Sequence, residues 1–354
     1  MSTSAVAGGK DRVHLPANRF QVLALSGGGY RGLYTAKILA DVEEHIGGPI
    51  GRHFDLIAGT SIGGILALAV ALEIPAKDMV KLFEDHGEAI FKRRASLFGI
   101  ARAPYSQAGL TNLLTGNKVF GQRKLESCIH PVIVPAINYS TGLPVVFKTP
   151  HHFDFVRDLN YSLVDIALAT SAAPGYFPRH VFDNRQYIDG GLFANAPGVL
   201  ALHEAQHFFG RPREEVCMVS IGTMSSRFTV DPRRNRSGGT FDWGGGNPAA
   251  TPKRLFGIAI SAQESLVHNM LGHQLEHYYH VDDALTDERA GAVALDKVNA
   301  AAREVLLGAG GERAKWCLGD SKFREYLQHI APTAVFYHGL HANTQGGDSN
   351  AHVA

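Results

Sequence analysis

The sequence predicts an α/β protein, a three-layer α/β/α sandwich with a mainly parallel central sheet. Two observations support this prediction. Before Pro75, two short apolar runs are each followed by a glycine-containing turn and then by a helical pattern. Farther along the chain, apolar runs again alternate with helical periodicity. Strand–turn–helix units of this kind cover both faces of a parallel sheet with helices.

The first unit begins with residues 21–25 (QVLAL), a short apolar run that predicts a buried strand. Ser26 and three glycines follow it. Residues 31–46 then carry apolar side chains at three- and four-residue spacing, which predicts an amphipathic helix that ends at a Gly-Gly-Pro sequence.

The second unit has a predicted strand over 54–58 and an apolar helix over 62–73 that stops before Pro75. Later segments are predicted more coarsely. Residues 145–149 and 216–221 are typical of strands, whereas residues 163–171 and the long stretch 252–308 favour helix.

Composition divides the chain into one large domain with two polar ends. We expect a flexible leader over 1–19, a single domain over 20–338 and a disordered tail over 339–354. Within the domain, residues 225–252 are rich in Gly, Pro and Arg and predict a mobile loop, with a lid over the site as the alternative.

Charge and cysteine content limit the function. Lys and Arg total 34 and Asp and Glu total 33, so binding of a nucleic acid polymer through overall charge is not expected. Three widely spaced cysteines suit a reducing cytoplasm. The longest apolar run, residues 62–72, has only about half of the ~20 residues that a membrane-spanning helix needs.

Residues 59–63 form a G-x-S-x-G pentapeptide between a predicted strand and an apolar helix. In this context a sharp turn exposes the serine hydroxyl, and the glycines make room for substrate. Ser61 is therefore a candidate nucleophile. The alternative is a glycine-rich turn that packs a helix on a sheet.

The segment SGGGYRG, residues 26–32, has two interpretations. Gly27, Gly29 and Gly32 satisfy G-x-G-x-x-G, which would make this a Rossmann-type nucleotide-binding protein. The acidic residue expected at the end of the second strand is missing, so that fingerprint is incomplete. Alternatively, the amides of Gly27, Gly28 and Gly29 form an oxyanion loop, which Arg31 supports unless it holds an anionic head group.

The base that would serve Ser61 is less obvious. Histidines 268, 273, 277 and 280 follow the serine as in α/β-hydrolases, but none lies in a strong local motif. Asp189 precedes two glycines after a short apolar run. A carboxylate against a serine hydroxyl in a dry site can become basic enough to act as general base.

These motifs together resemble the patatin-like phospholipases. The family's G-G-G-x-R-G loop matches residues 27–32, its G-x-S-x-G motif residues 59–63, its A-T-S-A-A-P segment residues 169–174, and its D-G-G motif residues 189–191. Asn195 and Pro197 also fit, and the resemblance covers roughly residues 20–225.

The resemblance implies a patatin-like fold and a Ser–Asp dyad without histidine, cofactor or metal. Ser61 would attack an ester carbonyl, Asp189 would take its proton, and the amides of Gly27 to Gly29 would hold the oxyanion. The substrate would be a membrane phospholipid. Ser26 departs from the family, where Asp is common, and we expect its hydroxyl to hydrogen-bond the loop.

Residues 31–43 (RGLYTAKILADVE), residues 261–273 (SAQESLVHNMLGH) and the compact length of 354 residues resemble bacterial effectors of antiphage signalling. Those effectors are patatin-like phospholipases switched on by a cyclic dinucleotide such as cyclic GMP–AMP (cGAMP). This implies a cytoplasmic enzyme that acts peripherally on the inner membrane, with a cyclic dinucleotide as activator. Two alternatives remain open: a constitutive or secreted acyl hydrolase, and a catalytically inactive binding module. The protein could also assemble into a homo-oligomer.

Two further patterns could indicate a zinc site or an anion site, but each has a simpler interpretation. Residues 273–277 spell H-x-x-E-H, a helical zinc motif without an evident third ligand, so interhelical or surface histidines are the simpler interpretation. Arginines 93–94 and the basic run 233–236 are typical of solvated loops, although they could meet anionic phosphate.

Overall fold

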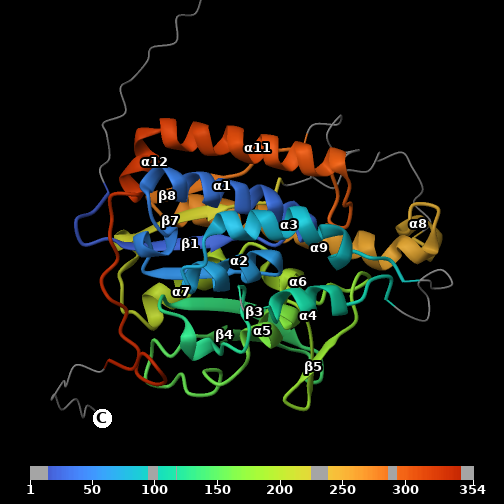
Figure 1. Ribbon diagram of the computed structural model, residues 1–354, viewed down its shortest axis with the longest axis horizontal. Helices are drawn as coiled ribbons and strands as arrows, with labels where there is room; N and C mark the ends of the chain where they lie inside the picture. The colour runs from blue at the N-terminus through green and yellow to red at the C-terminus, as the bar shows by residue number, and fades with distance from the viewer. Residues whose placement is uncertain (1–14, 95–102, 117, 225–237, 286–292, 344–354) are drawn as a thin grey trace, which may run out of the picture.

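The computed structural model of the protein describes residues 15–94, 103–116, 118–224, 238–285 and 293–343 (Figure 1). These residues build a central sheet of eight strands in the order β5-β6-β3-β2-β1-β7-β8, with β4 paired to β3. The strands are β1 (Phe20–Leu25), β2 (Leu56–Gly59), β3 (Val132–Asn138), β4 (Leu143–Lys148), β5 (His180–Phe182), β6 (Arg185–Asp189), β7 (Val216–Ile221) and β8 (His277–Val281).

The centre of the sheet is parallel, and one side is antiparallel. Strands β3, β2, β1, β7 and β8 pair in parallel. The β3–β4, β3–β6 and β5–β6 pairs are antiparallel. Since β1, β2 and β7 are buried along their whole length, their near-continuous apolar sequences follow from cover on both faces. The predicted fold class, a sandwich with a mainly parallel sheet, is confirmed.

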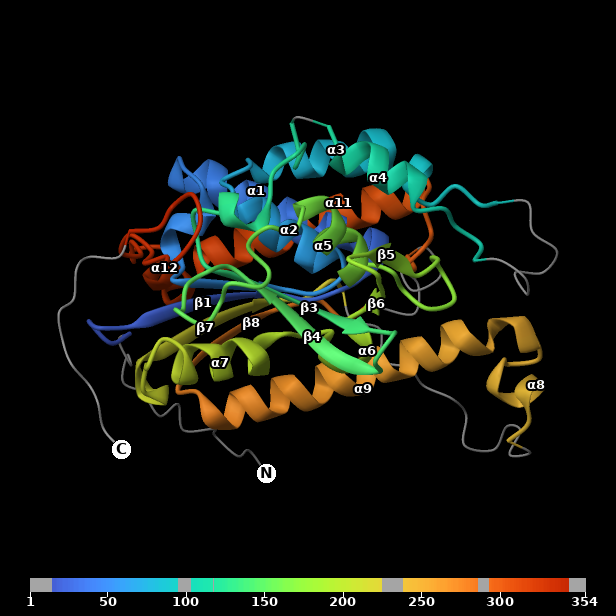
Figure 2. The same cartoon turned by 90° about the horizontal axis from the view of Figure 1, so that it is seen from below.

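Helices cover both faces of the sheet (Figure 2). One face carries α1 (Gly32–Ile46), α2 (Ile62–Ala71), α3 (Ala76–Ile90), α4 (Ala108–Leu114), α5 (Leu163–Thr170), α11 (Ala300–Gly319) and α12 (Ser321–Tyr326). The other carries α6 (Gly191–Ala194), α7 (Gly198–His207) and α9 (Thr251–Gln274). Each face has its own buried apolar cluster, as the two alternating sets of side chains on β1 require.

The first two strand–turn–helix units form within one or two residues of their predicted bounds, and so do β4, β7 and α5. The C-terminal third differs. The prediction of helix over 252–308 was wrong in the middle, because β8 follows α9 and joins the sheet beside β7. Its sequence, HYYHV, is half-exposed and lacks the aliphatic run that identified the inner strands.

The predicted loop over 225–252 lies partly outside the described residues. From residue 238 onward it contains α8 (Thr240–Trp243), a short 3-10 turn and the first residues of α9. The leader and the tail also lie largely outside the described residues, so these domain boundaries remain predictions. No helix in the part of the chain that the structure describes is long and apolar enough to cross a membrane.

Candidate active site

Ser61 lies on the turn between β2 and α2, at the carboxyl end of a central strand. Its backbone has φ 55° and ψ −126°, a conformation that residues other than glycine rarely adopt. The Thr170 hydroxyl holds this strained turn, because it accepts a hydrogen bond from the Ser61 amide (2.9 Å) and donates one to the carbonyl of Pro135 (2.7 Å). Strained serine turns of this type expose the hydroxyl above the sheet.

The glycines of the pentapeptide are required by close backbone contacts. A Cβ atom on Gly59 would lie 2.1 Å from the carbonyl oxygen of Gly63, and one on Gly63 would lie 2.3 Å from that of Leu25. Any side chain at either position would therefore push α2 away from the sheet. The pattern G-x-S-x-G is thus a packing requirement as well as a catalytic motif.

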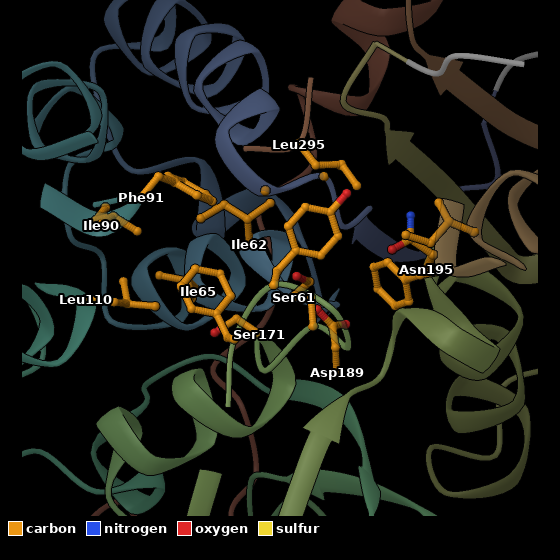
Figure 3. Close-up of a pocket in the computed structure, with 17 residues that line it drawn as sticks. Ser61, Ile62, Ile65, Ile90, Phe91, Leu110, Ser171, Asp189, Asn195 and Leu295 are labelled. Atoms are coloured by element: carbon orange, nitrogen blue, oxygen red, sulfur yellow. The ribbon is translucent and has the colours of Figure 1, made fainter. Parts of the chain in front are cut away.

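Asp189 ends β6 and lies beside Ser61 (Figure 3). Its side chain is 1% exposed, and Oδ1 accepts a hydrogen bond from the amide of Gly191 (2.7 Å). Burial raises the pKa of Asp189 to about 7, against the opposing effects of the Gly191 amide and the Ser61 hydroxyl. Oδ2 has no well-aligned hydrogen-bond partner. A carboxylate with this pKa and a free lone pair is suited to accept a proton at neutral pH.

The glycine loop before α1 faces the Ser61 turn. The Gly27 amide donates to the carbonyl of Asn195 (3.0 Å), so it is not available to an oxyanion in this structure. The amides of Gly28 and Gly29 donate to no residue that the structure describes, and both glycines line the pocket beside Ser61. The proposal for an oxyanion site therefore rests on Gly28 and Gly29 rather than on all three predicted amides.

Arg31 is buried beneath this loop and supports it from below. Its guanidinium donates to the carbonyls of Gly28 (3.4 Å) and Met224 (2.9 Å). Burial lowers the pKa of Arg31, and the carboxylates of Glu264 and Asp282 oppose that effect. Of the two roles considered for Arg31, support of the loop fits this position, whereas binding of a head group does not.

Asn195 joins the loop to the helices on the other face. Its Nδ2 donates to the carbonyl of Gly27 (3.1 Å) and to Oε1 of Glu264 on α9 (2.6 Å). The expectation for Ser26 was wrong: its side chain is fully buried and its hydroxyl has no hydrogen-bond partner among the described residues. The loop is instead fixed through backbone contacts and through the side chains of Asn195, Arg31 and Thr223, whose hydroxyl donates to the carbonyl of Gly27 (3.0 Å).

A mainly apolar pocket lies beside Ser61 and Asp189. Figure 3 shows Ser61 and Asp189 together, with Ile62, Ile65 and Phe91 extending away from them. The apolar lining consists of Ile62, Ile65, Ile90, Phe91, Leu110, Ala173, Tyr176, Phe177, Phe256, Ile260 and Leu295. Such a lining suits an acyl chain. Phe256, Ile260 and Leu295 were not predicted, because they come from segments whose sequence carries no motif.

Four residues from three distant segments meet beside the lining residue Leu295 or include it, and we call them the rim: Tyr105, Lys253, Leu295 and Asp296. The carbonyl of Leu295 accepts a hydrogen bond from the amide of Tyr30 (2.9 Å). Oδ2 of Asp296 accepts bonds from Lys253 (2.6 Å) and from the Tyr105 hydroxyl (2.7 Å). The rim thereby pins the start of α9 and the 293–298 segment against the oxyanion loop.

The histidines considered as alternative bases lie elsewhere. His268 stacks on His280 with ring centroids 3.8 Å apart, and its Nδ1 lies 2.6 Å from the Tyr278 hydroxyl. Burial lowers the pKa of each to about 4. The helical zinc motif does not form, because α9 ends at Gln274 and His277 begins β8. No histidine lines the pocket in the ranges that the structure describes.

A strained serine, a buried carboxylate, two free amides and an apolar pocket define the geometry of a serine acyl hydrolase. Comparison with known proteins agrees. The family model "Patatin-like phospholipase" matches residues 23–202. The chain belongs to the patatin-like phospholipase family, and the predictions of this family and of a hydrolase are confirmed. The nucleotide-binding interpretation of residues 27–32 is not supported, since those glycines face the Ser61 turn.

Three bacterial relatives cover nearly the whole chain. A cGAMP-activated phospholipase of Pseudomonas aeruginosa is 44% identical over 92% of this chain and 96% of its own length. Proteins of the same name from Escherichia coli and Vibrio cholerae are 35% and 32% identical, each over 84% of this chain. The matched regions cover 89% of the Escherichia coli protein and 91% of the Vibrio cholerae protein. The similarity therefore extends beyond the family motifs into the C-terminal third.

Proposed function

We propose that this protein is a lipid acyl hydrolase of the phospholipase A or lysophospholipase type, in which Ser61 and Asp189 form the catalytic dyad. The observation that carries this proposal is the meeting of a strained serine and a buried carboxylate of raised pKa at the end of an apolar pocket. The neighbouring amides of Gly28 and Gly29 complete the set that acyl transfer needs.

The chemistry follows from these positions in two half-reactions. The Ser61 oxygen attacks the ester carbonyl while Asp189 takes its proton, and the amides of Gly28 and Gly29 stabilise the resulting oxyanion. The tetrahedral intermediate collapses to an acyl-enzyme as Asp189 returns the proton to the leaving alcohol. Water, deprotonated by Asp189, then attacks the acyl-enzyme and releases the fatty acid and the Ser61 hydroxyl.

We further propose that a cyclic dinucleotide switches the enzyme on, and that it then degrades phospholipids of the inner membrane in antiphage defence. Support comes from the three relatives named as cGAMP-activated, which share sequence over most of this chain. An enzyme that acts peripherally on the membrane of its own cell needs such control. The low exposure of Ser61, only 8%, fits a resting state.

Fatty-acid release from vesicles of bacterial phospholipid, with and without a panel of cyclic dinucleotides including cGAMP, tests both proposals. Ser61→Ala serves as the blank. Release that requires one nucleotide is the expected result. Equal release without any nucleotide would make the protein a constitutive acyl hydrolase, and no release under any condition would contradict the phospholipid substrate.

A further inference from the structure

Three large apolar side chains are exposed on α8 and near the start of α9. Phe241 and Trp243 on α8 are 67% and 50% exposed, and Leu255 on the first turn of α9 is 45% exposed. In both Figure 1 and Figure 2, α8 lies at the far end of α9, beyond the edge of the sheet. This tip offers apolar surface to whatever approaches the molecule from that side.

The tip is a folded unit. The amide of Gly238 donates to Oδ2 of Asp242 (3.0 Å), and the Thr251 hydroxyl donates to the carbonyl of Thr240 (3.0 Å). Close contact of Gly244 with the carbonyl of Asn247 closes the turn between α8 and α9. Phe241 and Trp243 are therefore held outward by the backbone.

The same helix that carries the tip also lines the acyl pocket. Phe256 follows Leu255 directly and is buried in the pocket wall, and Ile260 lies one turn farther along α9. Lys253, two residues before Leu255, places its Nζ 4.2 Å from the ring centroid of Tyr176, another lining residue. The tip therefore adjoins the part of the pocket wall that Phe256 and Ile260 form.

Exposed basic residues adjoin another part of the pocket lining. Lys92, Arg93 and Arg94 follow the end of α3, immediately after the lining residues Ile90 and Phe91. Arg93 pairs with Tyr105 of the rim through a β-bridge. The cationic end of α3 and the apolar tip of α9 thus both adjoin the lining of the acyl pocket, a combination that complements anionic head groups over acyl chains.

From this arrangement we propose that residues 238–255 form a docking element that inserts Phe241, Trp243 and Leu255 into the interface of an anionic phospholipid bilayer. Trp and Phe favour the head-group level of a membrane. Three side chains offer far less area than the roughly 1,200 Å² that a stable protein–protein interface buries, so a bilayer suits this tip better than a second copy of the chain. The inference rests on the proposed function, because it places the membrane at the entrance to the acyl site.

The two tryptophans of the chain provide a matched pair of reporters. Trp243 lies on the tip, whereas Trp316 is 56% exposed on α11. In a Ser61→Ala background, Trp316→Phe leaves Trp243 as the only source of tryptophan fluorescence, and Trp243→Phe leaves Trp316 as the only source. We expect vesicles containing phosphatidylglycerol, added with cGAMP, to shift the Trp243 emission to the blue and to leave that of Trp316 unchanged. Phosphatidylcholine vesicles should give a smaller shift.

A co-sedimentation assay provides the second readout. The triple variant Phe241→Ser, Trp243→Ser, Leu255→Ser should bind phosphatidylglycerol vesicles at least tenfold more weakly than its parent. A control variant changes three exposed apolar residues elsewhere and should bind as the parent does: Trp316→Ser, Ile330→Ser, Leu340→Ser. Thermal melting of both variants confirms that each is folded.

Three outcomes would overturn the docking proposal: a shift of Trp316 without Trp243, unchanged binding by the tip variant, or a Trp243 shift that depends on protein concentration without vesicles. The last would assign the tip to contact between copies. Hydrolysis of soluble p-nitrophenyl butyrate by the unaltered protein, in the presence of the same panel of cyclic dinucleotides, tests the proposed function separately. If that activity is absent while Trp243 still inserts, the proposed function fails and the docking element stands.

Discussion

The floor of the pocket and its rim are built in different ways. The floor, Ser61 with Asp189 and the oxyanion loop, sits at strand ends and is fixed by backbone hydrogen bonds and by contacts too close for any side chain. The rim is fixed by one carboxylate, Asp296, which joins segments from three parts of the chain, and by one backbone hydrogen bond from Tyr30 to Leu295. Because the rim is held by fewer contacts, we expect it to open more readily than the floor.

The catalytic role of the floor is tested by substitution of Ser61 and Asp189. Ser61→Ala and Asp189→Asn should each lower kcat/KM for a soluble ester by roughly 10⁴-fold or more, because nucleophile and base act as a unit. His268→Ala is the matched control and should retain activity, since His268 contacts Tyr278 and His280 rather than the site. Loss of activity in a folded His268→Ala protein would contradict a dyad without histidine.

Rigidity of the oxyanion loop is tested next. A Cβ at position 28 would lie 2.2 Å from the Thr223 hydroxyl, so Gly28→Ala must displace the loop. We expect a loss of roughly 10² to 10³ in kcat, the usual cost of one oxyanion donor. A Cβ at position 48 would meet no atom within 4 Å, so Gly48→Ala should leave kcat unchanged. Equal rates for the two variants would show that the loop tolerates movement.

The pH profile sharpens the role of Asp189. With a pKa raised to about 7 by burial, its basic form is lost below neutrality, so kcat/KM should fall about tenfold per pH unit below 7. The same shift has a consequence for stability. Because the folded state favours the protonated carboxyl, stability present near pH 4 is lost as pH rises through 7. Asp189→Asn should escape that loss, and an acid limb near pH 4 would contradict the assignment.

The smallest expected effect concerns the rim. Burial would raise the pKa of Asp296, but bonds from Lys253 and Tyr105 outweigh it and hold the pKa below its usual value. Asp296→Ala should therefore lower the free energy of unfolding by about 1–3 kcal/mol, as expected for hydrogen bonds to a charged group. Asp41→Ala breaks only the surface pair with Lys37 and should cost about 0.3–0.5 kcal/mol. Urea unfolding that gives equal losses would remove the special role of Asp296.

The same division explains what the sequence could predict. Ser61, Asp189 and the glycine loop stand in short motifs, since sharp turns and close backbone contacts demand particular residues at fixed spacing. Leu295 and Phe256 enter the site through contacts between distant segments, and their types are those of any buried apolar residue. Strand β8 was missed because an outer strand with two tyrosines and two histidines lacks the apolar run of the inner strands.

The central claim, that Ser61 is activated by Asp189, is tested most directly by labelling with a fluorophosphonate followed by intact-mass analysis. We predict one adduct on the unaltered protein, none on Ser61→Ala, and much slower labelling of Asp189→Asn at pH 7. An adduct that persists in Ser61→Ala, or an Asp189→Asn protein labelled as fast as the unaltered one, would contradict the dyad.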